Sequence, residues 1–385
     1  MIRMFTAFTE EIDDAETAVT EILNQLDMDG RLCSNSVGIL HCSCDFDESD
    51  VARELCGRLP FDVVGCTSLS VQAQGVKSQL ALTITVLTSD DVKFFSGVSS
   101  PVSDDLNEPV TELYGRVIGS MPEKPALIMP FIPFMMNIGG DEFIEKINEL
   151  SGRQIPAFGT VSISGEEDFS RTYTIYNGEF YPTSLVLLGL AGDVNPMFFS
   201  ATVPEDKILK QKAIVTEVDK NILKTVNYMP AVSYLESIGL AKDGSVAGLE
   251  SMPFVVKIND GSVLTRASIS PTPNGEMILC GSIPVDATLA VATMGPEDVI
   301  TSTAEKVREA IVHGGGRSMI IYSCVARSWM LGTKVMAEHD KVDECIGDTV
   351  AYHFVYSGGE IFPAFLEDGS ISNQLQNDSM IICVL

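Results

Sequence analysis

Apolar and polar positions follow a repeating order along the chain. An apolar run at 36–42 (SVGILHC) predicts a buried strand, and residues 47–59 (DESDVARELCGRL) carry apolar side chains at helical spacing behind acidic capping residues. A second apolar run at 61–65 (FDVVG) predicts the next strand, which ends in a polar turn. The pattern therefore predicts a unit made of strand, loop, helix, strand and polar turn.

The same unit returns twice further along the chain. The repeat is one of pattern and not of sequence identity, so it indicates related α/β layers and not a solenoid. The second unit comprises a strand at 125–131, a helix at 141–150 and a strand at 155–164, and the third a strand at 317–324, a helix at 328–339 and a strand at 349–360.

A further apolar strand follows each polar turn, at 80–87, 183–190 and 379–385. In two units a hairpin signal precedes it, Asn177-Gly178 in one and Asp368-Gly369 in the other. The expected fold class is α/β, with two α/β domains, repeated strand-helix-strand units, hairpin inserts and mixed sheets.

The segment between the second and third units has a different character. Residues 213–226 (AIVTEVDKNILKTV) and 229–240 (MPAVSYLESIGL) are predicted to be helical, and a strand-rich stretch follows them with turns at Asp260-Gly261 and Asn274-Gly275. Gly and Pro near residue 200 mark the best break in the chain. We therefore expect one domain at 1–200 and another at 201–385.

Charge and composition exclude several classes of protein. The chain of 385 residues holds 25 basic and 53 acidic residues, a net charge of −28, which repels nucleic acid and anionic lipid. Its apolar runs are too short to span a membrane, and its N-terminus lacks the apolar core of a signal peptide. Nine cysteines without a disulfide spacing fit a reducing compartment. We expect a soluble cytoplasmic protein.

The polar turns carry the candidate chemistry, because open α/β sheets bind ligands at the carboxyl ends of their strands. Cys66, Thr67 and Ser68 end the first unit's second strand, and the segment 159–172 (GTVSISGEEDFSRT) supplies Ser162, Ser164 and three acids, Glu166, Glu167 and Asp168. A loop of this kind either cups a polar ligand or is a solvated turn.

Thiol chemistry is the competing interpretation. Cys66 could act as a nucleophile if a base such as His41 lay beside it, but a buried thiol is the default. In HCSC at 41–44, strand alternation puts Cys42 and Cys44 on one face and His41 on the other, and no second cluster completes a metal site. We expect no metal and no cofactor.

Arg327 stands directly after a strand in YSCVAR at 322–327. A guanidinium fixed there suits a carboxylate or a phosphate. The alternative is an internal ion pair, for which Glu360 in YSGGEIF is the obvious partner.

These motifs together resemble the FIST family, sensory proteins built of a FIST N and a FIST C domain. The resemblance rests on VVGCTS, the GTVSISGEEDF loop with the hairpin behind it, YSCVAR, YSGGEI and SNQ at 372–374. It covers nearly the whole chain, with departures at Ala326 and Ser372 and in SLSVQAQ. It implies a FIST N-like domain at 1–200, a FIST C-like domain at 201–385 and a small ligand, with amino acids the usual proposal.

Motifs and resemblance together give an intracellular sensor of a small polar ligand, without catalytic residues. Its expected partners are the ligand, a separate signalling protein, since no output segment follows Leu385, and a second copy of the chain. The alternative is a thiol-dependent hydrolase or transferase with Cys66 or Cys324 as nucleophile and His41 or His353 as base. The expected ligand-binding residues are Cys66, Thr67, Ser68, Ser162, Ser164, Cys324, Arg327, Tyr356, Glu360 and Asn373.

Overall fold

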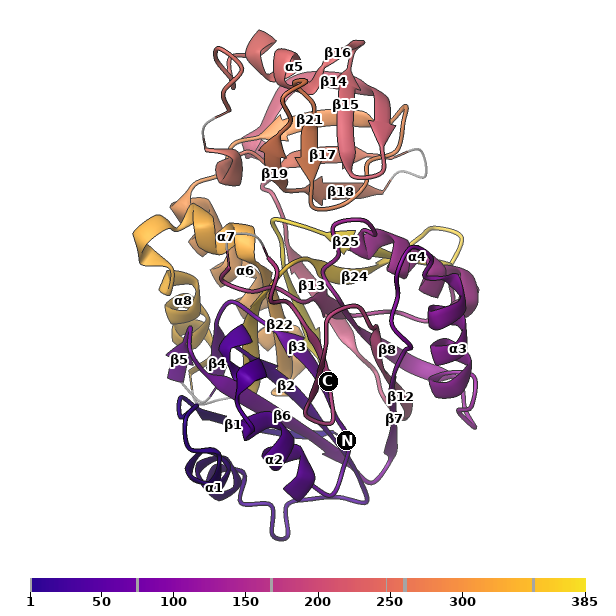
Figure 1. Cartoon of the computed structure of the whole chain (residues 1–385), viewed down its shortest axis with the longest axis vertical. Helices are drawn as coiled ribbons and strands as arrows, with labels where there is room; N and C mark the ends of the chain where they lie inside the picture. The colour runs from indigo at the N-terminus through magenta and orange to yellow at the C-terminus, as the bar shows by residue number, and fades with distance from the viewer. Residues whose placement is uncertain (1, 74–75, 167–168, 247, 259–261, 348–349) are drawn as a thin grey trace.

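The computed structural model describes residues 2–73, 76–166, 169–246, 248–258, 262–347 and 350–385. Two parts are distinguished in Figure 1. The body comprises residues 2–201 and 295–385, and the β-module, residues 202–294, stands on one end of it. The chain thus leaves the body once and returns to it once.

Three units of one design form the body, as the repeating pattern predicts. In each, two parallel strands flank the predicted helix, as β2 (Asn35–Cys42) and β3 (Val63–Thr67) flank α2 (Val51–Arg58). The corresponding elements are β8 (Pro125–Ile132), α4 (Gly140–Ser151) and β9 (Gly159–Val161) in the second unit, and β22 (Met319–Cys324), α7 (Val325–Met330), α8 (Ala337–Ile346) and β23 (Tyr352–Ser357) in the third.

After each parallel pair the chain makes a hairpin, a returning strand and, for two units, an edge strand. The hairpins at Asn177-Gly178 and Asp368-Gly369 are confirmed, and a third one was not predicted. These elements are β4 (Val71–Ala73), β5 (Val76–Ser78) and β6 (Leu82–Ser89); β10 (Thr174–Tyr176), β11 (Glu179–Tyr181), β12 (Val186–Gly192) and β13 (Met197–Ala201); β24 (Glu360–Phe365), β25 (Ile371–Gln376) and β26 (Met380–Val384); and the edge strands β1 (Arg3–Thr9) and β7 (Val92–Val98).

The hairpins interlock the units. The strand orders of the three body sheets are β1-β6-β2-β3-β10-β11, β25-β24-β9-β8-β12-β7 and β13-β26-β22-β23-β4-β5. Each sheet therefore closes with a hairpin from another unit: the first unit's hairpin joins the third sheet, the second unit's joins the first, and the third unit's joins the second. No unit can complete its sheet alone.

The three sheets enclose a common core around a pseudo-threefold axis. Each unit sends one residue of its central strand to the middle, where the ring of His41 lies 5.9 Å from that of Phe131 and 5.6 Å from that of Tyr322. The outer faces are covered by helices: α1 (Ala15–Leu26) with α2, α3 (Asn107–Val117) with α4, and α6 (Pro296–Gly314) with α8 (Figure 1). This burial removes apolar surface on both sides of every sheet.

The β-module corrects one prediction. Residues 213–226 form a hairpin and not a helix, because β-branched residues alternate with polar ones and Lys220, at φ 53°, makes the turn. The helix within 229–240 is confirmed as α5 (Ala231–Ser237), and Gly275, at φ 78°, makes the predicted second turn. The strands are β14 (Ile208–Asp219), β15 (Ile222–Val226), β16 (Met229–Pro230), β17 (Phe254–Lys257), β18 (Val263–Arg266), β19 (Ser268–Pro271), β20 (Met277–Leu279) and β21 (Thr288–Ala292).

Two further predictions need comment. The helix expected at 328–339 is interrupted, because Gly332 adopts φ 58° between α7 and α8. The turn expected at Asp260-Gly261 lies outside the described residues. The division into 1–200 and 201–385 stays a prediction, while strands from both ranges share two of the body sheets.

Candidate functional site

The three polar turns meet in a ring at the carboxyl ends of the parallel strands. The units contribute to it in cyclic order, the first touching the second, the second the third, and the third the first. The backbone hydrogen bonds that join them run from Ile163 N to Thr67 O (3.1 Å), from Val161 N to Gly359 O (3.0 Å) and from Tyr356 N to Ser70 O (3.2 Å).

Glycines allow two of these strand ends to approach their neighbours closely. A Cβ atom on Gly65 would stand 1.7 Å from the carbonyl oxygen of Leu40, and one on Gly159 would stand 2.1 Å from that of Pro130. No side chain fits at either position. The glycine that ends the FDVVG run is thus required by strand pairing.

Three hydroxyls of the ring accept hydrogen bonds from backbone amides. Thr67 Oγ1 accepts a hydrogen bond from Tyr173 N at 3.0 Å, and Ser162 Oγ accepts one from Phe134 N at 2.9 Å. Ser164 Oγ accepts from the amide of Glu166 at 3.4 Å. Ser68 differs, because its buried Oγ has no hydrogen-bond partner in the part of the chain that the structure describes.

Arg327 is fully buried and forms an internal ion pair, but its partner is Glu338 of α8 and not Glu360. Its Nε and Nη2 donate to Glu338 Oε1 at 3.0 and 2.8 Å, and Nη2 also donates to Thr303 Oγ1 at 2.8 Å. Nη1 is buried without a hydrogen-bond partner among the described residues. One side of the guanidinium is therefore fixed by hydrogen bonds, while Nη1 on the other side is buried and unpaired among the described residues.

Both carboxyl oxygens of Glu360 accept hydrogen bonds from other residues of the body. Ser357 Oγ donates to Oε1 at 2.6 Å and Ser379 Oγ donates to Oε2 at 2.8 Å. Burial raises the pKa of Glu360 well above its ordinary value, in spite of these two donors. Its carboxyl group is thus held as a structural hydrogen-bonding group.

Asp378, in the turn before β26, is the carboxylate that Arg327 influences without an ion pair. Burial raises the pKa of Asp378 to about 7, against the opposing effect of Arg327. Its Oδ2 and the neighbouring Asn377 Nδ2 are both buried and make no hydrogen bond to any described residue. These two atoms and Arg327 Nη1 are polar groups whose burial is uncompensated.

The remaining predicted residues divide between this region and the outside of the sheet. Tyr356 lies beside the ion pair, where burial and then Glu338 raise its pKa. Cys324 ends β22, and burial raises the pKa of its thiol. Asn373 instead faces α4, where its amide is fully occupied by Asn148, Ala157 and Ile155.

A narrow cavity of about 20 Å³ lies between this region and the β-module. Val161 and Gly358 of the ring line it on the body side, and Cys280 and Gly281 line it from the module. Burial, and after it the charge of Asp378, raise the pKa of Cys280, but Asp378 is not among the residues that line the cavity. The space is sufficient for a water molecule, and a larger ligand requires the walls to move.

Cys66 Sγ lies 3.6 Å from His41 Nδ1, but the two residues do not form a nucleophile and base pair. The same Nδ1 lies 3.1 Å from the Cys66 carbonyl oxygen, which only accepts, so Nδ1 carries the proton. Burial raises the pKa of the Cys66 thiol and lowers that of His41 to about 3. The imidazole therefore presents no lone pair to the thiol.

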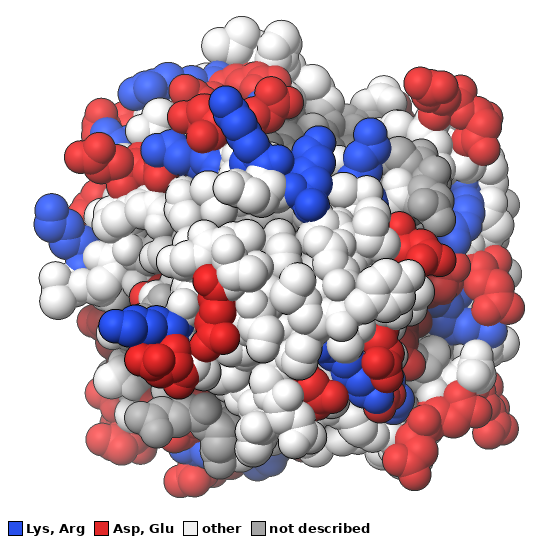
Figure 2. Space-filling model, turned by 90° about the horizontal axis from the view of Figure 1, so that it is seen from above, with Lys and Arg blue, Asp and Glu red and all other residues white. Residues whose placement is uncertain are grey.

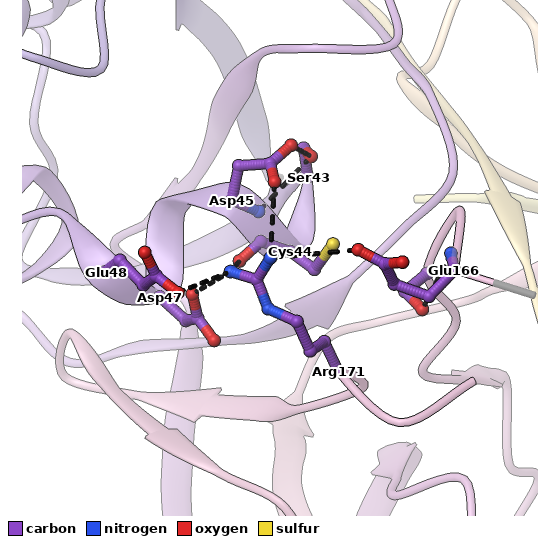
Figure 3. Close-up of polar contacts among 8 residues, drawn as sticks. Ser43, Cys44, Asp45, Asp47, Glu48, Glu166 and Arg171 are labelled. Atoms are coloured by element: carbon purple, nitrogen blue, oxygen red, sulfur yellow. Dashed lines mark hydrogen bonds and ion pairs between the residues drawn. The ribbon is translucent and has the colours of Figure 1, made fainter. Parts of the chain in front are cut away.

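The acidic loop after Ser164 is tied down at the rim of the body (Figure 3). Arg171 forms ion pairs with Asp45 (3.5 Å), Glu48 (3.5 Å) and Glu166 (3.8 Å), and its hydrogen bond to Asp47 raises its pKa. Glu167 and Asp168 lie outside the described residues. The described residues hold no group of three side chains suited to a metal ion.

Two family models match the chain. The model of the FIST N domain matches residues 36–229, and the model of the FIST C domain matches residues 231–363. The chain belongs to the FIST family. FIST domains are sensory domains, which indicates signal transduction and the binding of small ligands.

Other comparisons with this FIST protein are weaker. No curated protein matches the chain. A crystal structure of cyanuric acid hydrolase from A. caulinodans is similar at 7% identity and a TM-score of 0.33, over 100% of this chain and 98% of that one. No helix among the described residues of the FIST chain is long and apolar enough to cross a membrane.

Sequence reasoning missed three important residues of this FIST chain. Glu338 stands in an ordinary polar helical segment, where nothing indicates burial. Asn377 and Asp378 carried a usable signal, because they form a polar turn directly before the last apolar strand.

Proposed function

We propose that this FIST protein is an intracellular sensor that binds a small zwitterion, of the amino-acid type, where the ring of polar turns meets the β-module. The observation that carries the proposal is the group of buried polar atoms without partners, above all Arg327 Nη1 and Asp378 Oδ2. Leaving such atoms buried and unpaired costs about 1–3 kcal/mol each. A ligand that pairs with both removes that cost.

Arg327 is the proposed carboxylate clamp. Glu338 and Thr303 hold Nε and Nη2, so the guanidinium plane is fixed before a ligand arrives. Nη1 then offers N–H donors in fixed directions, from which an oxygen of a carboxylate can accept a charge-assisted hydrogen bond. The cost of ordering this side chain is already met by the fold.

Asp378 is the proposed partner of the ammonium group, in place of Glu360. The carboxyl oxygens of Glu360 are taken by Ser357 and Ser379, whereas Oδ2 of Asp378 is unpaired. Because its pKa is about 7, Asp378 can become fully ionised when a cation binds beside it. Asn377 Nδ2 adds a donor for an oxygen of the ligand.

The route of entry runs along the junction with the β-module. The module rests on the body through hydrogen bonds from Arg266 Nη1 to Leu375 O (2.8 Å) and from Thr265 N to Gln376 Oε1 (3.0 Å), directly beside Asn377 and Asp378. A ligand larger than water must open this junction. Binding would thereby change how the module sits on the body, which is a signal that another protein can read.

The location is part of the proposal. All nine cysteines are free thiols, which supports a reducing cytoplasm. No observation favours the thiol enzyme as a second candidate, since the proton on His41 Nδ1 faces Cys66.

A thermal-shift screen of the whole chain tests the proposal. The probes are the twenty amino acids, together with the methyl ester and the deaminated acid of each compound that raises the Tm. A compound at one hundred times its Kd stabilises the native state by about 2.7 kcal/mol. We expect zwitterions to raise the Tm and their one-charge analogues to fail.

Arg327→Lys and the surface control Asp29→Asn complete the design. Lysine keeps the positive charge beside Glu338 but lacks the planar guanidinium group. Ligand binding should therefore be lost while the protein stays folded. Asp29→Asn should behave as the wild type. A screen without any positive compound, or unchanged binding by Arg327→Lys, would refute the proposal.

A further inference from the structure

Charge is distributed unevenly between the two parts of the molecule. The β-module, residues 202–294, holds eight basic and ten acidic residues, a net −2 out of the chain's −28. The remainder of the chain therefore carries −26. Two copies of this protein repel one another wherever their bodies approach, and least where their modules do.

The module also presents an apolar area to solvent. Ile214 and Val285 are each more than two-fifths exposed and Tyr228 is 91% exposed. They are neighbours, because Asn227 N bonds to Ile214 O and Asp286 N bonds to Val215 O, both at 2.9 Å. Figure 2 looks onto the module end and shows a broad uncharged area, with many acidic side chains toward the edge of the view.

Strand β14 gives this area a bipolar pattern of charge. Lys210 and Lys212 are exposed on one side of Ile214, and Glu217 and Asp219 are exposed on the other. A bulge between Val215 and Glu217 shifts the alternation by one residue, so Glu217 and Asp219 lie on the same outer face as Lys212 and Ile214. Lys210 lies in an irregular stretch of the strand between Ile208 and Lys212, where its side chain is exposed. The strip thus runs from basic through apolar to acidic.

Such a strip is complementary to itself. A twofold axis near Ile214 places the lysines of one copy against the acids of the other, and the reverse, while the apolar centres meet. Lys224 lies 3.7 Å from Glu217 and 3.5 Å from Asp219, and Lys220 Nζ donates to Asn137 O of the body at 2.9 Å. With Lys220 directed to the body, the two acids and Lys224 leave that end of the strip with one negative charge. Lys210 and Lys212 form no ion pair with another described residue and are available to a partner.

We propose that the outer face of β14, with Ile214, Tyr228 and Val285, is the interface of a symmetric homodimer. The bodies then point away from each other, which keeps the two large negative charges apart. The exposed apolar side chains are buried at the centre, and charged side chains surround them, as in other dimer interfaces. The proposal is independent of the ligand site.

Sedimentation velocity of the whole chain over a concentration series tests the interface. The wild type should form dimers as the concentration rises. Lys210→Glu/Lys212→Glu makes both ends of the strip acidic, and Glu217→Lys/Asp219→Lys makes both ends basic, so each variant alone repels itself. We expect each to weaken dimerisation at least about tenfold.

Mixing the two variants gives the decisive result. An acidic strip then faces a basic strip, and the equimolar mixture should dimerise again. The control Lys93→Glu/Lys124→Glu changes the same charge on the body and should dimerise nearly as the wild type does. A monomeric wild type, dimers of either swapped variant at wild-type strength, or a mixture that stays monomeric would each overturn the proposal.

Discussion

Arg327 and Glu338 form an ion pair of 2.8 Å from which solvent is wholly excluded. Breaking such a pair leaves a buried charge without a partner and costs about 3–5 kcal/mol. The first prediction is therefore that Glu338→Gln lowers the free energy of unfolding by about that amount, measured by urea denaturation. Arg53→Ala, which breaks exposed pairs with Asp50 and Glu179, should leave it nearly unchanged. Equal effects of the two substitutions would contradict the buried pair.

The second prediction concerns the interlocked hairpins. Gly178 and Gly369 both adopt φ 84° in equivalent hairpins, so alanine strains the backbone at each by about 1 kcal/mol. Only at Gly178 does a Cβ atom also collide, 2.7 Å from Ala52 O. Gly178→Ala should therefore lose more stability than Gly369→Ala, by about 1–3 kcal/mol in urea unfolding. If both lose the same amount, the second unit's hairpin does not pack on the first unit as described.

The third prediction concerns pH. Asp378 has a pKa of about 7 when folded and an ordinary value of 3.8, so between these values the native state holds a proton that the unfolded chain has released. Its stabilising contribution is complete below about pH 4 and is lost as the pH rises through 7. The difference amounts to at most about 4 kcal/mol.

Asp378→Asn, which resembles the protonated form, removes this dependence. Urea unfolding from pH 4 to pH 8 should therefore show the variant gaining stability relative to the wild type as the pH rises. Asp29→Asn serves as the control and should show no such gain. Parallel curves for wild type and Asp378→Asn would mean that Asp378 is ionised in the native protein throughout.

The fourth prediction separates a sensor from a thiol enzyme. Burial raises the pKa of Cys66, and His41 offers it a proton and not a lone pair. Native protein treated with iodoacetamide at pH 8 should therefore be alkylated first at the half-buried Cys33 and Cys345, with Cys66 protected. Mass spectrometry of the digested protein gives the order. Preferential labelling of Cys66 would revive the enzyme interpretation.

Local patterns predicted the three units well, because each strand is an apolar run and each helix has one apolar face. They did not predict that the hairpin at Asn177-Gly178 completes the first unit's sheet, since hairpin signals specify a turn and not a neighbour. The prediction of a helix at residues 213–226 was wrong for a related reason. Their β-branched residues alternate, but the charged residues between them also suit an amphipathic helix.

The candidate site shows the same limit. The motif ending in Arg327 identified a cation behind a strand, and the structure does bury it among polar groups. Its partner, Glu338, lies in α8, eleven positions further along the chain and beyond the interruption of the predicted helix. Only the packing of α8 on the body buries Glu338, and the local sequence does not show that. The convergence of the three polar turns likewise depends on the pseudo-threefold arrangement, which no single unit encodes.

The central claim is that a zwitterion bridges Arg327 and Asp378. Isothermal titration calorimetry of a compound that raises the Tm, against wild type, Asp378→Asn and Asp29→Asn, tests it most directly. The account predicts equal affinity for the wild type and Asp29→Asn, and a loss of at least about tenfold, or 1.4 kcal/mol, for Asp378→Asn. Unchanged affinity in Asp378→Asn would contradict it.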